Sequence, residues 1–276
     1  MLGDLLGQTQ EDLDLEIKSE ALPLFQASAL GIMKEVIAGT KSPDQAWQEM
    51  DARRAALMVA EKDSKDLVSS LVMQALGGPL EEANQFSSLG NDAAAYDRIV
   101  EIIQAKQAVM AVLAKSGWTE QENFDVEFCS PYDKKSVCGF LEFDDRRALF
   151  MIYLRRLARR AEDEGKITDE ARAKLREVQG LLGIDESIMD GQYKAFFGQN
   201  LSMAMERGMK ALLKEYNEEA LKSWQANIAT IIENYKLNAV MVKSSGRGMY
   251  NEAVVAINKE VRFGFHVLFL SAAIWF

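Results

Sequence analysis

Apolar residues recur at intervals of three and four along most of the chain, which is the spacing of helices that bury one side. The first such run ends at Gly39, which we expect to stop a helix because glycine accepts the left-handed conformation of a helix end. The apolar side of this predicted helix comprises Leu13, Ile17, Leu24, Phe25, Ile32, Met33, Val36 and Ile37.

Residues 42–79 carry the signals of two further helices. Ser42 is a typical N-cap, Pro43 suits the first helical position, and Gln45 can bond back to the backbone of Ser42. The inner face of the helix that follows comprises Ala46, Trp47, Met50, Leu57 and Met58. The inner face of the next helix comprises Leu67, Val68, Leu71, Val72, Ala75 and Leu76. We expect residues 77–79, Gly-Gly-Pro, to stop it.

A long helix is predicted for residues 93–115, and Gly117 is expected to close it. Its apolar side comprises Ile99, Ile102, Ile103, Val109, Met110 and Leu113. Residues 118–142 mix aromatic residues, a Ser-Pro pair and both cysteines without helical periodicity. We interpret this segment as an irregular linker or a docked loop and place the main internal boundary there. This boundary divides the chain into an acidic N-terminal helical region, 1–117, and a C-terminal helical region, 143–260.

Helical periodicity returns at Asp144. Arg155 and Arg159 point away from the apolar side of the helix that begins there. That apolar side comprises Leu149, Phe150, Tyr153, Leu154, Leu157 and Ala161.

A tight helical hairpin is predicted directly afterwards. We expect Gly165 to end the arginine-rich helix in the left-handed conformation and Thr168 to cap the next one. Gly183 is expected to end that short helix, and Asp185 to cap another. Further helices are predicted to about residue 213, over 217–235 and over 250–260.

The composition agrees with a helical protein that has a sizeable core. Apolar residues make up 48% of the 276-residue chain, and only four prolines interrupt it, so we predict an all-α fold. The formal net charge is −10, and residues 1–100 hold most of the excess acid. This balance argues against general binding to nucleic acid, which needs clustered Lys and Arg.

Cys129 and Cys138 are the two cysteines of the chain. Two cysteines are too few for a disulfide framework, and they favour a reducing compartment. They lie nine positions apart in the irregular segment, close enough to pair if the segment folds back on itself. We interpret them as a candidate redox pair, with inert thiols as the alternative.

The densest basic cluster lies between Arg146 and Arg160. Its candidate contact face for an acidic partner comprises Arg155, Arg156, Arg159 and Arg160. The alternative is a solvated surface with intramolecular ion pairs, because acidic residues follow directly at 162–164.

Residues 160–171 resemble a calcium-binding loop that lacks both of its anchors. Glu162 and Glu164 stand at ligand positions of an EF-hand loop, but Arg160 and Ala171 replace its first and last carboxylates. We therefore predict an ordinary turn and no metal site. The single histidine, His266, has no catalytic partner in the local sequence, so we expect neither catalytic residues nor a cofactor.

The two ends of the chain carry no recognised targeting signal. Residues 1–16 are acidic and lack both the basic start of a signal peptide and the Arg- and Ser-rich character of a transit peptide. Residues 263–276 are apolar but shorter than the roughly 20 residues that a membrane helix requires. We interpret 261–276 as an apolar tail, either translated non-coding sequence or a peripheral membrane-contacting helix.

Two motifs carry a resemblance to a known family. The first is FDDRRALFMIYLRR, with an apolar Leu-Phe-Met-Ile-Tyr-Leu run at 149–154, and the second is KLREVQGLLGIDESI, with Leu-Gly-Ile-Asp at 182–185. Over residues 143–260 the chain resembles the stromal helical region of the 110-kilodalton subunit of the translocon at the inner envelope membrane of chloroplasts. Tellurite-resistance-type helical domains use similar turns.

The resemblance implies an irregular, solenoid-like array of helical hairpins that acts as a non-enzymatic scaffold in chloroplast protein import. Implied partners are preproteins with their transit peptides, stromal chaperones and other translocon subunits. The implied location is the stromal side of the plastid inner envelope, with membrane association through an N-terminal anchor that this chain lacks. The alternative interpretation is a soluble helical domain that binds divalent cations or acts in a stress response, as tellurite-resistance-like domains do.

Overall fold

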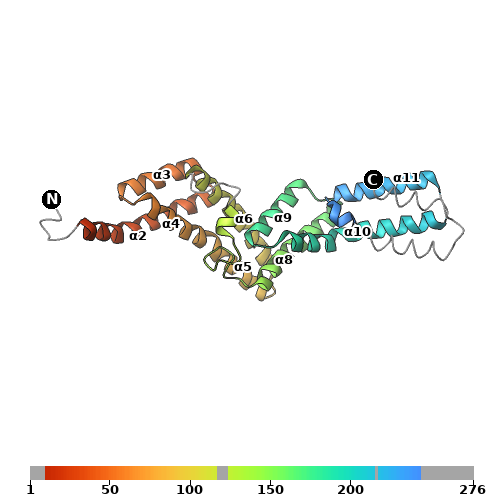
Figure 1. Cartoon of the computed structure of the whole chain (residues 1–276), viewed down its shortest axis with the longest axis horizontal. Helices are drawn as coiled ribbons and strands as arrows, with labels where there is room; N and C mark the ends of the chain where they lie inside the picture. The colour runs from red at the N-terminus through yellow and green to blue at the C-terminus, as the bar shows by residue number, and fades with distance from the viewer. Residues whose placement is uncertain (1–9, 117–123, 215–216, 244–276) are drawn as a thin grey trace. The chain divides into compact units, whose positions relative to one another are not determined.

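The computed structural model of the chain describes residues 10–116, 124–214 and 217–243. Every regular element in these ranges is a helix, and no strand occurs in them, which confirms the predicted all-α fold (Figure 1). The chain divides into two compact units. The first comprises the described residues up to Tyr153 together with Ala173–Ile184, and the second comprises Leu154–Arg172 and the described residues from Asp185 onward. The solenoid-like repeat remains a prediction.

The first unit is built around helices α2 and α6. The α-helices that lie wholly within it are α2 (Gln10–Ile37), α3 (Pro43–Ala56), α4 (Glu61–Val72), α5 (Gly78–Ser88), α6 (Asp92–Ser116) and α7 (Phe124–Phe128). Helix α2 packs against α3, α4 and α6, and α5 packs along α6. The largest fully buried side chains of this unit include Phe25, Met33, Met50, Leu71, Leu76, Leu80, Ile99, Ile102, Leu113, Phe124 and Phe150.

The predicted junction between the first two helices is confirmed. Gly39 follows α2 with a φ of 71°, in the left-handed region that suits glycine. Ser42 Oγ accepts a hydrogen bond from the Gln45 backbone N–H at 3.3 Å, and Gln45 Oε1 accepts one from the Ser42 N–H at 3.3 Å. These two bonds form the reciprocal capping box that the sequence predicts, with Pro43 in the first turn of α3.

Three of the predicted core positions are wrong. Leu24 is 60% exposed and Ile37 is 37% exposed, because successive residues turn an α-helix by about 100° and these two fall at opposite edges of the stripe that buries Phe25 and Val36. Met58 is 73% exposed, since α3 ends at Ala56 and Met58 adopts a left-handed φ of 54°. The side chains of Leu13 and Ile17 lie outside the part that the structure describes.

The predicted stop at residues 77–79 is also wrong. A single π-helical segment, η1 (Met73–Gly77), follows α4, and α5 begins directly at Gly78. Pro79 lies in the first turn of α5, directly after the π-helical segment, where the ladder of i to i−4 hydrogen bonds is already interrupted. Glycine and proline are therefore accommodated within a continuous run of helix.

Residues 124–142 form a docked loop in the first unit. After the short helix α7 the chain runs through turns, and the Val137 N–H donates to the Phe128 carbonyl at 2.8 Å, so the segment folds back on itself. Its buried side chains are Phe124, Phe128, Cys129, Ser136, Val137, Cys138 and Leu141. Gly117 and residues 118–123 lie outside the described residues.

Helices α8 (Phe143–Glu164) and α9 (Asp169–Leu181) each contribute residues to both units. All six predicted apolar positions of α8 are buried, and Arg155 and Arg159 are exposed, as predicted. Gly165 has a φ of 70° and Gly183 a φ of 56°. The Thr168 hydroxyl accepts a hydrogen bond from the Ala171 N–H at 3.1 Å, which confirms the predicted N-cap of α9.

The second unit contains the long helices α10 (Glu186–Lys214) and α11 (Glu218–Asn234), which lie side by side (Figure 1). Asn217 caps α11, because its Oδ1 accepts hydrogen bonds from the backbone N–H groups of Glu219 and Ala220. Asp185 precedes α10 as predicted, but its backbone carbonyl, rather than its side chain, accepts the hydrogen bonds of the first turn.

The predicted helix over 250–260, His266 and the apolar tail, 261–276, lie outside the described residues. Among the helices that the structure describes, none combines the length and the apolar character that a membrane crossing requires.

Candidate functional site

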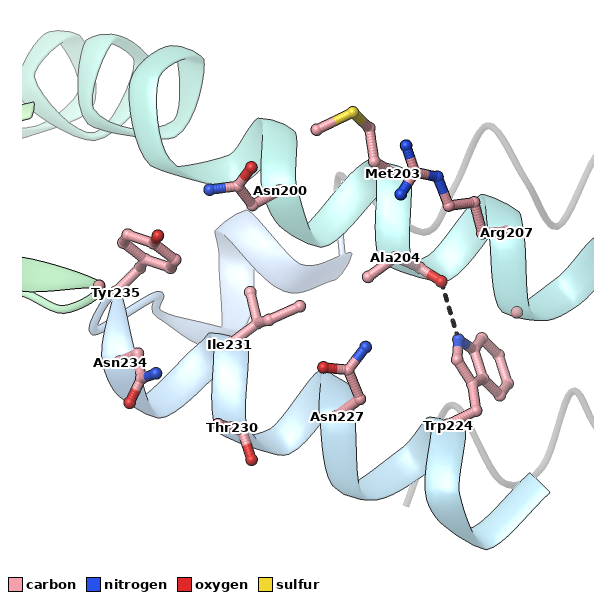
Figure 2. Close-up of a pocket in the computed structure, with 12 residues that line it drawn as sticks. Asn200, Met203, Ala204, Arg207, Trp224, Asn227, Thr230, Ile231, Asn234 and Tyr235 are labelled. Atoms are coloured by element: carbon pink, nitrogen blue, oxygen red, sulfur yellow. Dashed lines mark hydrogen bonds between the residues drawn. The ribbon is translucent and has the colours of Figure 1, made fainter. Parts of the chain in front are cut away.

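An open groove of about 660 Å³ lies along the α10–α11 pair in the second unit (Figure 2). Its walls are two helices whose residues contribute at intervals of three and four, so each helix presents one stripe to it. Asn227, Ile231 and Trp224 project from α11 towards α10 (Figure 2). The residues that line the groove are Gly165, Asn200, Met203, Ala204, Arg207, Gly208, Trp224, Asn227, Thr230, Ile231, Asn234 and Tyr235.

Trp224 fixes one end of the groove. Its indole Nε1 donates a hydrogen bond to the Ala204 carbonyl at 3.0 Å, and the side chain is buried against α10. A Cβ at Gly208 would lie 2.1 Å from Trp224 Cδ1 and Nε1, so only glycine leaves room for the indole. The two helices are therefore held close together at this end.

Three asparagines give the groove its polar character. Asn200 lies on α10, and Asn227 and Asn234 lie on α11. Among the described residues, none of these three side-chain amides has a hydrogen-bond partner, and all three are at least partly accessible. Each amide offers both a carbonyl acceptor and an NH₂ donor. The groove therefore presents paired donors and acceptors to a ligand.

Arg207 gives the groove a positive charge. Its guanidinium is exposed, and within the described part of the chain no carboxylate lies among the residues that line the groove. The neighbouring Glu206 pairs with Lys210, whose hydrogen bond lowers the pKa of Glu206. Glu233 pairs with Lys236 at 2.7 Å. Glu206 is thus paired within α10 and Glu233 with Lys236, which follows α11, and Arg207 adds only a weaker coulombic attraction to Glu206.

The other end of the groove rests on a packed aromatic cluster. Tyr235 stacks on Phe197 with ring centroids 6.0 Å apart, and the backbone carbonyl of Tyr235 accepts a hydrogen bond from the Tyr193 hydroxyl at 2.8 Å. Arg172 lies over the Tyr193 ring at 4.6 Å, and burial raises the pKa of the Tyr193 hydroxyl. These contacts give the groove a rigid base.

The candidate redox pair lies far into the core of the first unit. Cys129 and Cys138 are both free and buried, and Cys138 Sγ donates to the Cys129 backbone carbonyl at 3.1 Å. Burial raises the pKa of both thiols, and the nearby Asp125 carboxylate raises the pKa of Cys129 further. The reactive thiolate is thereby disfavoured at neutral pH. A regulatory disulfide remains a prediction.

The structure separates the arginines of the basic cluster. Arg155, Arg156, Arg159 and Arg160, the candidate contact face, are exposed on α8, and Arg160 Nε pairs with Glu164 at 2.6 Å. Arg146 is instead buried, and its Nη1 donates to the carbonyls of Leu182 and Gly183 at 2.9 Å each. It therefore binds the carbonyls that follow α9 and does not belong to a contact surface.

The calcium-like turn shows no assembled site. Glu164 pairs with Arg160, and among the described residues no group of three His, Cys, Asp or Glu side chains is placed to hold a metal ion.

The α10–α11 groove was not predicted from the sequence, because its asparagines have the pattern of ordinary exposed helix positions. The signal that could have indicated it is the spacing of seven residues between Asn200 and Arg207 and between Asn227 and Asn234, which places each pair on one side of its helix.

Comparison with known protein families, with curated proteins and with solved structures gives no match to the chain.

Proposed function

We propose that the chain is a non-enzymatic helical scaffold in chloroplast protein import, which binds preproteins and stromal chaperones at the inner envelope. The motifs at 149–154 and 182–185 support the assignment to import through their resemblance to the 110-kilodalton translocon subunit. They form a buried helix stripe and a glycine-ended helix terminus, the packing roles expected of such a scaffold.

The observation that carries the binding role is the groove along α10 and α11. It is open, and its three asparagine amides have no hydrogen-bond partner among the described residues. A side-chain amide carries the same donor and acceptor as a peptide bond, so it can pair with the backbone of a bound polypeptide. Met203 and Ile231 offer apolar contact area beside these amides. Such a surface binds protein segments.

The test is a retention experiment with the full chain immobilised on a resin. Arg- and Ser-rich transit peptides and a stromal extract are applied, and bound peptide and chaperones are quantified with antibodies. We expect saturable retention of transit peptides over sequence-scrambled peptides of the same composition, and recovery of at least one stromal chaperone. Recovery of neither, under conditions in which an intact import scaffold retains both, would refute the proposal.

A further inference from the structure

We infer that the α10–α11 groove binds an extended peptide segment that carries an acidic side chain at the Arg207 end. This inference rests on the proposed function as a polypeptide-binding scaffold, and it names the site and the chemistry that the site selects. Three features of the groove carry it: the amides, their spacing and the charge.

The amides of the groove match a peptide backbone. Asn200 and Asn227 come from different helices and line the same groove, so a chain lying along the groove can meet a side-chain amide from each helix. An extended segment has free backbone N–H and C=O groups on both edges, whereas a helical segment has already used them. The groove therefore favours an extended ligand.

The spacing of the polar groups sets a register for that ligand. Asn200 and Arg207 are seven residues apart on α10, which corresponds to about 10 Å along a helix axis. An extended chain covers the same length in about three residues. A peptide bond held by Asn200 therefore places a side chain about three residues further along beside Arg207. Asn227 and Asn234 repeat the same interval on α11.

The charge decides which side chain fits beside Arg207. The guanidinium is exposed, Glu206 is engaged by Lys210, and no carboxylate is among the described lining residues. A carboxylate on the ligand can accept two parallel hydrogen bonds from arginine, whereas a ligand cation meets like charge. The groove thus selects an acidic position. Within the proposed import role, its ligand is a preprotein or chaperone segment outside the Arg-rich, acid-poor transit peptide.

The experiment measures binding of fluorescent nine-residue peptides to the full chain by anisotropy. The peptides are rich in Ser, Ala and Gly and differ only at one central position, which is Glu, Gln or Lys. We expect the Glu peptide to bind roughly tenfold more tightly than the Gln peptide and the Lys peptide to bind most weakly. Raising the salt concentration should reduce the difference, because screening weakens the ion pair.

Two groups of variants test the assignment. Arg207→Gln should abolish the difference between the Glu and Gln peptides, and Arg207→Glu should reverse the order so that the Lys peptide binds best. Asn227→Ala should weaken the binding of all three peptides by about the same factor. The matched controls are Gln225→Ala, which alters an exposed position of α11 that does not line the groove, and Arg147→Gln, which alters an exposed arginine of the first unit. Thermal unfolding by circular dichroism verifies that each variant is folded.

The inference is overturned if no peptide binds saturably, if the three peptides bind equally, or if the Arg207 variants behave like Arg147→Gln. Its failure is distinguishable from failure of the scaffold proposal. A chain that retains transit peptides and chaperones but shows no charge preference in the groove overturns the inference alone, whereas loss of all retention overturns both.

Discussion

Gly208 of α10 lies directly against the indole of Trp224 on α11. A Cβ at Gly208 would approach Trp224 Nε1 to 2.1 Å, and that nitrogen donates to the Ala204 carbonyl at 3.0 Å. Glycine within a helix is less favourable than alanine by about 1 kcal/mol, so its place here is explained by the room that the indole needs. This pair sets the distance between the two helices that line the groove.

We expect Gly208→Ala to destabilise the second unit by about 1–3 kcal/mol, because the added methyl group displaces the indole and breaks its hydrogen bond. Gly191→Ala is the matched control, since it lies in the same helix and a Cβ there would meet nothing within 4 Å. That control should stabilise the chain by about 0.5–1 kcal/mol through the gain in helix propensity. Urea denaturation followed by Trp fluorescence measures both, and equal effects would contradict the role given to Gly208.

Arg146 is expected to stabilise the end of α9 through its two carbonyl contacts. Arg146→Met keeps the apolar length of the side chain but leaves the Leu182 and Gly183 carbonyls without their donor, which should cost about 2–3 kcal/mol. The exposed neighbour Arg147 provides the control, and Arg147→Gln should change stability by less than about 0.5 kcal/mol. Chemical denaturation of both variants checks the difference.

The buried ammonium of Lys106 pairs with Asp125 at 2.5 Å and lies over the Phe124 ring. We expect Asp125→Asn to cost roughly 2–3 kcal/mol, less than for a fully buried pair because the Asp125 side chain is 41% exposed. The double variant Lys106→Met with Asp125→Asn should recover most of this loss, since no unpaired cation remains buried. A double-mutant cycle of unfolding free energies measures the coupling.

The exposed pair Lys115–Asp44 is the control for that cycle. Its side chains are 53% and 65% exposed, so Asp44→Asn should cost less than about 1 kcal/mol. If Asp125→Asn and Asp44→Asn lowered the unfolding free energy by similar amounts, burial of Lys106 would not be the reason that its ion pair stabilises the fold.

Because its two thiols are buried, the chain should become less stable in alkaline solution. Burial raises the pKa of Cys129 in the folded state above the unfolded thiol value of about 8.5. The contribution of the buried thiol to the free energy of unfolding is therefore fully present below about pH 8.5. It is lost as the pH rises, because the thiol ionises readily only in the unfolded chain. The unfolding free energy should fall between pH 8.5 and 10.5 by at most about 1.4 kcal/mol per pH unit for this group.

Cys129→Ala isolates that contribution. The variant should be less stable at pH 7 because of its cavity, but its loss between pH 8.5 and 10.5 should be smaller than that of the parent chain. Urea titrations at these pH values measure the two slopes. Equal slopes, or rapid alkylation of both thiols in the folded protein at pH 7, would contradict the burial of Cys129.

The helices were predictable from sequence wherever local rules determine them. The capping box at Ser42 and the left-handed Gly165 and Gly183 depend on neighbouring residues alone, and the stripe of α8 repeats over several turns. Met58 and the continuation through η1 were not predictable, because the end of α3 and the accommodation of Pro79 depend on how the helices pack.

The groove escaped prediction for a related reason. Asn200 and Asn227 belong to different helices, and nothing local indicates that both face one hollow. Arg146 shows the converse, since it reads as part of a basic cluster but is buried by the turn that follows α9. Motifs of consecutive residues can be predicted from the sequence. Sites assembled from separate helices can be recognised only once the packing of those helices is known.

The connectivity of the two units also constrains the order in which the chain can fold on the ribosome. The core of the first unit includes Leu175, Val178 and Leu181, which are synthesised after Leu154–Arg172 of the second unit. A nascent chain that ends at residue 172 therefore lacks these side chains of its N-terminal core, together with the buried Leu182 and Ile184. Domains usually fold in turn as they emerge, but here the first unit must wait until part of the second has been made.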